Sequence, residues 1–373
     1  MEHAKKIICT VTNDLTYDQR MIRICSTLVV HGYDVLLVGR KLKKSLPLSQ
    51  RPFGQKRFSC IFNKGFLFYA EYNLRLFLFL MNKDFDLINS IDLDTLLAGA
   101  IAAKRKDRKL VYDAHEYFTE VPEVVNRPIV KAFWAQIASV FIPKADGAYT
   151  VSKGLQDIFE TKYKTKFSLV RNLPFAKIQT VEKNRSVDQK VILYQGAVNE
   201  GRGLREMILA MHELRDHKLH IIGEGDLSSQ LRELVVYEKL EHRVSFLGYI
   251  KPEQLQAHTE AAWIGINLLE NKGLSNFFSL ANRTFDFIQA GLPAIHMNFP
   301  EYKVIQDKYM IGVLLDDLKT ESIIAAINRF EHDSFYNDVK LNCMIASKEL
   351  TWENEVGELL GVYEKVFDGK KQV

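Results

Sequence analysis

The sequence predicts an α/β protein with two domains, each a parallel sheet covered by helices on both faces. Short continuous apolar runs alternate with segments of helical periodicity, which is typical of strands buried on both sides. The chain has 373 residues, which is more than one hydrophobic core usually supports. Because 47% of the residues are hydrophobic and 26% are charged, the chain has enough apolar side chains to form two cores.

The first half is expected to alternate strand and helix from its beginning. A polar loop follows the first strand, and residues 91–94 are expected to form a second polar loop. The expected strands are 6–12, 34–38, 86–89, 109–112, 147–151 and 168–170, and the expected helices are 20–31, 66–80, 95–105, 129–142 and one that begins at Ser152. The polar, aperiodic residues 171–190 are interpreted as an interdomain linker. This division gives domains at 1–172 and 187–351.

The second half repeats the alternation and ends in a long helix. The expected strands are 191–194, 219–222, 244–247, 264–268, 294–296 and 312–314, and one helix is expected over 342–367. Since ligands of open parallel sheets bind outside the carboxyl ends of the strands, polar residues that follow strands are the first candidates for a site.

The stretch 277–295 combines a polar segment, a helix and a buried strand. Its helix should begin near Ala281 or Asn282 and stop at Gly291, with Pro293 beyond. Backbone N–H groups at a helix start suit a phosphate, and the carboxylate of Asp286, one turn in, can accept hydrogen bonds from sugar hydroxyls. A surface helix that simply leads into a buried strand is the alternative.

Two further groups of residues follow predicted strands. The turn 196–203 (GAVNEGRG) offers backbone N–H groups and the guanidinium of Arg202 to an anion, although a glycine-rich tight turn alone is also compatible. His115 stands beside carboxylates and could be a general base, a metal ligand or a structural hydrogen-bonding group, of which the last is favoured. No motif for a metal site or an acyl nucleophile is present.

Charge is distributed unevenly along the chain. Residues 1–185 carry 30 Lys and Arg against 18 Asp and Glu, net +12, whereas residues 186–373 carry 20 against 28, net −8. A basic first half suits an anionic partner such as a lipid phosphate, a membrane surface or a nucleic acid, although a solvated surface explains it equally well. No basic-aromatic motif of a nucleic-acid reader is present, so no nucleic-acid partner is expected.

Cysteine usage and hydropathy indicate a cytoplasmic protein. The four cysteines show no paired spacing and lie in apolar surroundings, as reduced core residues do. A strand begins almost at the N-terminus, so no signal sequence is expected, and no apolar run reaches the roughly 18 residues that span a bilayer. The expected location is cytoplasmic, with peripheral contact with the inner membrane through the basic N-terminal half.

Several motifs resemble those of bacterial retaining glycosyltransferases of family 4, which have the GT-B architecture. They are TNDLTYDQRMIRI, NSIDLDTLLAGAIAAK, LVYDAHEYFTEVPE, ILYQGAVNEGRGL, IIGEGDL and SLANRTFDFIQAGLPAI, and they cover nearly the whole chain in order. The resemblance implies two Rossmann-like domains that face a central cleft, with the C-terminal helix at 352–373 packed back on the first. It also implies transfer, with retention, from a nucleoside-diphosphate sugar to a hydroxyl of a glycan or lipid-linked glycan in surface polysaccharide synthesis. No cofactor and no metal are expected.

The resemblance assigns site residues by position. Asp286 matches the second motif carboxylate, a ribose ligand, but Phe278 stands where the first acid is expected, so Ser279, Glu270 or Asn282 would have to replace it. Arg202 matches the second member of the basic pair on the diphosphate, while Ala197 or Val198 stands in place of the first and Arg283 would supply the missing charge.

The remaining assignments concern the sugar, the nucleotide and the acceptor. His115 matches a residue against the donor sugar, and Glu224 lies in the loop that lines the nucleotide. The expected catalytic residues are His115, Arg202 and Asp286; the expected donor-binding residues are Gly196, Arg202, Glu224, Ser279, Asn282, Arg283 and Asp286; the expected acceptor-side residues are Asn13, Asp14, Asp18, Asp92, Asp113 and Glu116. A non-catalytic nucleotide-sugar-binding or scaffold relative, or another GT-B enzyme such as a sugar-nucleotide epimerase, is the alternative function.

Overall fold

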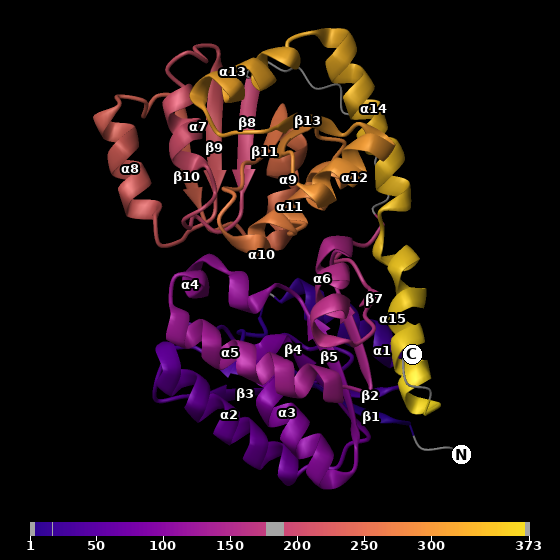
Figure 1. The fold of residues 1–373 in the computed structure, drawn as a ribbon. Helices are drawn as coiled ribbons and strands as arrows, with labels where there is room; N and C mark the ends of the chain where they lie inside the picture. Colours follow the sequence, from indigo (N-terminus) through magenta and orange to yellow (C-terminus); the bar gives the residue numbers. More distant parts are fainter. Residues whose placement is uncertain (1–3, 17, 177–189, 370–373) are drawn as a thin grey trace. The chain divides into compact units, whose positions relative to one another are not determined.

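The computed structural model describes residues 4–16, 18–176 and 190–369. The chain divides into two compact units. The first unit contains the chain up to Asn172 together with the chain from Glu355 onward, and the second unit contains Leu173–Asn354 (Figure 1). The expected linker at 171–190 lies mostly outside the described residues. Both units are α/β and contain a parallel sheet, as the alternation of apolar runs and helical periodicity predicts.

The first unit is built on a seven-stranded sheet in the order β3-β2-β1-β4-β5-β6-β7, and all its strand pairs are parallel. The strands are β1 Lys6–Thr10, β2 Asp34–Lys41, β3 Gly54–Ser59, β4 Leu87–Ile91, β5 Lys109–Ala114, β6 Gly147–Thr150 and β7 Ser168–Leu169. The central strands β1, β4 and β5 are buried almost throughout, which explains their uninterrupted apolar sequences. The edge strand β3 was not predicted, because its sequence GQKRFS is mostly polar.

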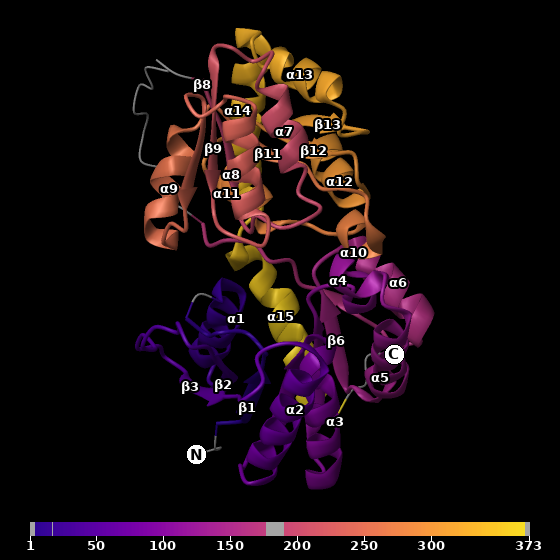
Figure 2. The same ribbon diagram turned by 90° about the vertical axis from the view of Figure 1, so that its left-hand side faces the viewer.

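Helices cover both faces of this sheet. They are α1 Gln19–Val30, α2 Gly65–Met81, α3 Asp92–Lys106, α4 Pro122–Val125, α5 Pro128–Phe141 and α6 Lys153–Tyr163, with short 3-10 turns at Phe118–Glu120 and Ile142–Lys144. Helices α2 and α3 lie side by side (Figures 1 and 2), and α5 packs on α3. The expected loop at 91–94 is wrong, because α3 begins at Asp92 directly after β4.

The expected single helix over 342–367 is also wrong, because the chain forms two helices there. Helix α14, Asp333–Glu349, belongs to the second unit, and α15, Trp352–Phe367, lies almost wholly in the first. Gly147 of β6 has no side chain where Val362 and Val366 of α15 pack against it, and the hydroxyl of Tyr363 accepts a 2.9 Å hydrogen bond from Asn89 of β4. The last helix is therefore an integral part of the first unit's core.

The second unit has a six-stranded parallel sheet in the order β10-β9-β8-β11-β12-β13. The strands are β8 Lys190–Gln195, β9 His217–Ile222, β10 Val244–Gly248, β11 Ile264–Asn267, β12 Ala294–Met297 and β13 Gly312–Leu315. The order reverses between β8 and β11, and such a reversal is where ligands of open α/β sheets bind.

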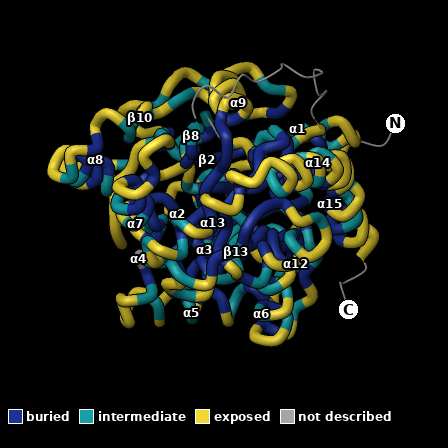
Figure 3. Tube along the Cα trace, turned by 90° about the horizontal axis from the view of Figure 1, so that it is seen from above, coloured by how far each residue is buried: buried dark blue, intermediate teal, exposed yellow. Residues whose placement is uncertain are grey.

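The remaining helices of the second unit pack on this sheet and on each other. They are α7 Leu204–Ala210, α8 Ser228–Tyr237, α9 Pro252–Ala261, α10 Gly273–Phe277, α11 Asn282–Gln289, α12 Pro300–Tyr309 and α13 Thr320–Arg329. Helix α11 packs on α14 and α9, and α7 packs on α13 and α8. Figure 3 shows exposed residues along α8 and α14, whereas the central strands β11 and β12 are buried throughout.

Candidate functional site

Helix α11 begins where the sequence predicts, and a neighbouring helix fixes its start. Ala281 precedes the helix in an extended conformation, and its N–H donates to the hydroxyl of Tyr302 on α12 over 3.0 Å. Phe285 and Ile288 are buried beneath the helix, and Gly291 ends it with a φ of 61°. The first turn of α11 is therefore held by packing and by Tyr302 rather than by a side-chain cap.

Arg283, in this first turn, is a buried cation without a carboxylate partner among the described residues. Its guanidinium carbon lies 4.5 Å from the ring centroid of Tyr194, at the end of β8. Its Nη1 atom is buried and has no hydrogen-bond partner in the described part of the chain. A buried charge of this kind is costly unless an anion compensates for it. The position therefore suits an anionic ligand.

Polar atoms on β11 and β12 lie behind this turn. Asn267 and His296 are paired in register on the two strands, and Asn267 donates from Nδ2 to the hydroxyl of Thr284 over 3.4 Å. Asn267 Oδ1 and both ring nitrogens of His296 are buried without a partner among the described residues. Burial and the charge of Arg283 lower the pKa of His296 to about 3, so its ring is neutral. The ring stacks on Tyr302, with the centroids 5.2 Å apart.

Glycines bring the loops that follow β8 and β9 close together. Gly196 has a φ of 137°, and a Cβ there would stand 2.9 Å from Arg283 Nη2, so the glycine leaves room for the guanidinium. Gly223 has a φ of 129°, and a Cβ there would collide with the carbonyl oxygen of Gly196. Arg202 lies between Gly201 and Gly203, which pack against residues 268–276. The candidate cations Arg202 and Arg283 are therefore carried on neighbouring elements of one sheet edge.

Asp286 is oriented by a polar chain. Gln195, the last residue of β8, donates from Nε2 to Asp286 Oδ2 over 2.9 Å. The hydroxyl of Thr259 on α9 donates to Gln195 Oε1 over 2.8 Å, which fixes the orientation of the amide. The half-buried carboxylate of Asp286 is thus held in place and can accept hydrogen bonds from hydroxyl groups of a ligand.

The other donor-side candidates already have protein partners. Glu224 forms an ion pair with Arg232 at 2.7 Å, and this hydrogen bond lowers its pKa. Ser279 donates to the carbonyl oxygen of Asn276 over 2.8 Å. Glu270 pairs with Lys272 at 2.6 Å. Asn282 is exposed at the helix start. The structure brings Gly196, Asn282, Arg283 and Asp286 to the region around α11.

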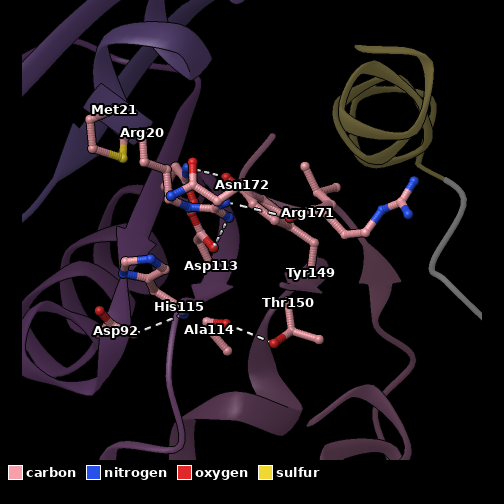
Figure 4. A network of polar contacts seen from close by, with 12 residues as sticks. Arg20, Met21, Asp92, Asp113, Ala114, His115, Tyr149, Thr150, Arg171 and Asn172 are labelled. Atoms are coloured by element: carbon pink, nitrogen blue, oxygen red, sulfur yellow. Dashed lines mark hydrogen bonds and ion pairs between the residues drawn. The ribbon is translucent and has the colours of Figure 1, made fainter. Parts of the chain in front are cut away.

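The first unit gathers acids at the carboxyl ends of β4 and β5. Asp92 adopts a φ of 56° as the first residue of α3, and its Oδ1 accepts the backbone N–H of His115 over 2.9 Å (Figure 4). The same oxygen accepts the N–H of Glu116 over 3.4 Å. Burial, followed by the charges of Glu116 and Asp94, raises the pKa of Asp92 well above its usual value. Burial and the nearby guanidinium groups of Arg20 and Arg23 lower the pKa of His115 to about 3, so its ring is neutral.

Asp113 is engaged in a buried ion pair. Arg20 Nη2 lies 2.7 Å from Asp113 Oδ1, and Arg20 Nε lies 3.3 Å from Oδ2, so the contact is bidentate (Figure 4). Both side chains are almost fully buried. Asp113 thus has a structural partner that the sequence did not reveal.

Three other acceptor-side candidates hold the loop after β1 in shape. Asp18 accepts the N–H of Met21 over 3.1 Å and caps α1, and Asn13 donates to Asp18 over 3.2 Å. Asp14 pairs with Arg57 of β3 at 2.9 Å. Their observed partners give these residues a structural role in the described chain.

Sequence reasoning missed Arg20, Gln195 and His296, although each leaves a signal. Arg20 lies on the apolar face of its helix beside Met21 and Ile24, where an unpaired charge would be costly. Gln195 and His296 are polar residues inside or at the end of runs that are otherwise apolar. A polar side chain on the buried face of an element is thus the sign that would have identified all three.

Within the described ranges, no group of three or more His, Cys, Asp or Glu side chains could hold a metal ion. The same ranges contain no helix that is both long and apolar enough to cross a membrane.

Family models match both units. The model of glycosyl transferases group 1 matches residues 177–346, and the model of glycosyltransferase family 4 matches residues 19–173. An uncharacterised glycosyltransferase of Methanocaldococcus jannaschii is 21% identical over 266 residues, which make up 69% of this chain and 64% of that protein. The chain therefore spans less than two thirds of this relative's length.

Solved structures of similar fold cover the chain almost completely. Sucrose-phosphate synthase of Thermosynechococcus elongatus has a TM-score of 0.82 at 15% identity and covers 98% of this chain and 100% of its own. HepE of Anabaena in complex with UDP-glucose has a TM-score of 0.74 at 14% identity, with 97% and 99% coverage. These identities are low, so the likeness concerns the fold, which is the GT-B arrangement of two Rossmann-like units.

Proposed function

Because the chain belongs to the glycosyltransferases, by the two family models that together cover most of it, we propose that it transfers a sugar from a nucleoside-diphosphate sugar to a hydroxyl group. The acceptor is a glycan or a lipid-linked glycan, and the reaction retains the anomeric configuration. We place this reaction in surface polysaccharide synthesis at the cytoplasmic face of the membrane. UDP and UDP-glucose, seen in the HepE structures, are the first donors to test.

The observation that carries this proposal is the uncompensated guanidinium of Arg283. It lies in the first turn of α11, where backbone N–H groups also favour negative charge. A diphosphate bound there would supply the anion that the buried cation lacks. Arg202 on the neighbouring loop would contribute a second positive charge.

Asp286 fits the nucleoside end of the same ligand. Its carboxylate, held by Gln195, would accept hydrogen bonds from two ribose hydroxyls, while the diphosphate lies at the helix start. The departures at Phe278 and Ala197 remove one acid and one base expected from the resemblance. Arg283 replaces the missing positive charge, whereas Ser279, which donates to a backbone carbonyl, retains lone pairs that can accept a hydrogen bond from the sugar.

The chemistry follows from the leaving group. The bond from the sugar C1 to the phosphate oxygen breaks, the acceptor oxygen bonds to C1 on the same face, and the acceptor proton passes to the departing phosphate. The negative charge on the nucleoside diphosphate grows during this step, so Arg202, Arg283 and the helix start stabilise the transition state more than the ground state. No protein nucleophile takes part. The neutral His115 would hydrogen-bond to the donor sugar without adding charge.

Calorimetry with UDP, GDP, ADP and their common sugar conjugates tests the proposal. Wild type should bind one nucleotide sugar selectively, Arg283→Met should lose this affinity, and Arg215→Gln, which changes an exposed arginine of the same unit, should keep it. Absence of binding across the panel would contradict the assignment and favour a scaffold protein. Conversion of the nucleotide sugar alone into its epimer would show that the protein is an epimerase.

A further inference from the structure

The first unit exposes a group of apolar side chains on two segments that are far apart in sequence. The apolar patch consists of Ile61, Phe62, Phe66, Leu67, Ile129, Val130 and Phe133, all of which are exposed. Ile129 is 85% exposed, Ile61 76% and Phe66 67%. Single exposed apolar residues are common, but seven of them on two segments that touch through Phe66 and Phe133 point to an interaction surface.

Contacts fix the geometry of this patch. The rings of Phe66, at the start of α2, and Phe133, on α5, lie 5.9 Å apart and join the two segments. The carboxylate of Glu71 accepts the backbone N–H groups of Ile61, over 2.9 and 3.0 Å, and of Phe62, over 3.0 Å. The buried Trp134 anchors α5 against Tyr69, with the ring centroids 5.3 Å apart. The fold therefore presents these side chains to solvent in a defined arrangement.

The two chain segments that carry the patch have charges of one sign, and the nearby acids Glu71 and Glu120 are paired with Arg75 and Lys131. Every charged residue in 61–67 and 126–133 is basic, namely Lys64, Arg127 and Lys131. Lys131 pairs with Glu120 at 2.6 Å, whereas Lys64 and Arg127 are exposed. The net charge of +12 over residues 1–185 extends this positive character to the whole first half. Aromatic and aliphatic side chains beside exposed cations match the boundary of an anionic lipid bilayer.

The patch lies at the functional edge of its sheet. All strands of the first unit are parallel, so the starts of the helices that follow them, including α2, lie at the edge where β4 and β5 end. Asp92 and His115 lie at this edge too.

We propose that the apolar patch docks on a bilayer with anionic headgroups and that the bilayer presents the acceptor hydroxyl. Ile61, Phe66 and Ile129 enter the headgroup region, and Lys64 and Arg127 contact the anionic headgroups. Docking itself is independent of the chemistry, whereas the statement about the acceptor rests on the proposed glycosyl transfer.

Vesicle co-sedimentation tests the docking. Wild type should bind vesicles of phosphatidylcholine and phosphatidylglycerol, and it should bind vesicles of phosphatidylcholine alone more weakly. The double variant Phe66→Ser/Ile129→Ser should bind at least about tenfold more weakly. The matched control Val30→Ser/Tyr237→Ser, which changes residues that are 78% and 81% exposed elsewhere, should bind as wild type does. Lys64→Glu/Arg127→Glu should reduce binding chiefly to the anionic vesicles.

Equal binding by the patch variant and the control, or no binding of wild type to anionic vesicles, would overturn the proposal. A wild-type dimer in lipid-free sedimentation velocity that the patch variant loses, without vesicle binding, would assign the patch to a second copy instead. Nucleotide affinity, measured on the same samples, separates the two proposals. Its absence alongside vesicle binding would reject the glycosyl transfer alone, and its retention in the patch variant would show that the nucleotide site is intact.

Discussion

A buried arginine lies at the carboxyl edge of each sheet, but the two arginines differ in their partners. In the first unit, Arg20 and Asp113 form a buried bidentate ion pair, and Asp92 accepts backbone N–H groups. In the second unit, Arg283 is buried over Tyr194 with no carboxylate partner in the described chain. The buried arginine of the first edge is paired with a carboxylate, whereas that of the second edge has no carboxylate partner among the described residues. The proposed function accounts for this difference, because it gives the second edge an anionic ligand and the first edge a neutral acceptor hydroxyl.

The largest effect is expected when the arginine of the buried ion pair in the first unit is replaced. Arg20→Met leaves Asp113 buried without its partner, so the free energy of unfolding in urea should fall by about 3–5 kcal/mol. The control Lys153→Met breaks an exposed pair with Asp157 and should cost at most about 0.5 kcal/mol. A loss below about 1 kcal/mol for Arg20→Met would mean that Asp113 does not depend on this pairing.

The pH dependence of stability should differ in sign between the two edges. The pKa of His296 is lowered to about 3 in the fold, so as pH falls from 6.5 toward 3 the unfolded chain gains the proton first and stability decreases, by at most about 1.4 kcal/mol per pH unit. The pKa of Asp94 in the first unit is raised by burial to about 7, so its contribution is favourable below about pH 4 and is lost as pH rises toward 7.

Urea unfolding at a series of pH values measures both effects. Relative to wild type, His296→Gln should lose less stability on acidification from pH 6.5, and Asp94→Asn should lose less as pH rises from 4 to 7. Parallel pH profiles for all three proteins would show that these side chains titrate normally in the fold.

Replacing the buried arginine of the second unit by methionine should not destabilise the protein, in contrast to Arg20→Met. Arg283→Met removes a buried charge that has no carboxylate partner in the described part of the chain, so the free energy of unfolding should be unchanged or higher. Nucleoside-diphosphate affinity should fall about a hundredfold, since hydrogen bonds to charged groups contribute about 1.5–3 kcal/mol. Calorimetry and urea unfolding on one preparation measure both quantities. A large loss of stability would show that Arg283 has a structural role.

The smallest expected effects concern the two other donor-side residues. Arg202→Ala should lower kcat/KM at least about tenfold, or about 1.4 kcal/mol, through weaker stabilisation of the diphosphate. Asp286→Ala should weaken nucleotide binding and leave the fold intact, since Thr259 still holds Gln195 when the carboxylate that Gln195 donates to is removed. Steady-state kinetics and calorimetry check these outcomes, and wild-type values would remove either residue from the site.

The regular alternation of apolar strands and periodic helices made the fold predictable from the sequence. The prediction failed where a strand is polar or where apolar periodicity runs on between two helices. The buried parallel strands and the start of α11 were predicted, because continuous apolar runs and a helix stop at Gly291 are strong local signals. Strand β3 was missed, because its polar side chains pair across the loops, as Arg57 does with Asp14. The break between α14 and α15 was missed, because apolar periodicity continues through Leu350 and Trp352.

The sequence predicted which residues belong to the candidate site more accurately than it predicted the residues they contact. Arg283 and Asp286 could be named from their place in the helix, but the burial of Arg283 over Tyr194 and the chain from Asp286 to Thr259 connect residues far apart in sequence. Asp14 and Asp18 were assigned to the acceptor, because a sequence shows that a carboxylate follows a strand but not that Arg57 or the start of α1 already uses it.

The position of α15 has a consequence for the order in which the protein is made. Tyr363 bonds to Asn89, and Val362 and Val366 pack on Gly147, so the first unit lacks part of its core until residues beyond 355 have been synthesised. Domains usually fold in order as they leave the ribosome. Here the unit that is translated first is completed last, and a premature stop codon after the second unit would damage the first.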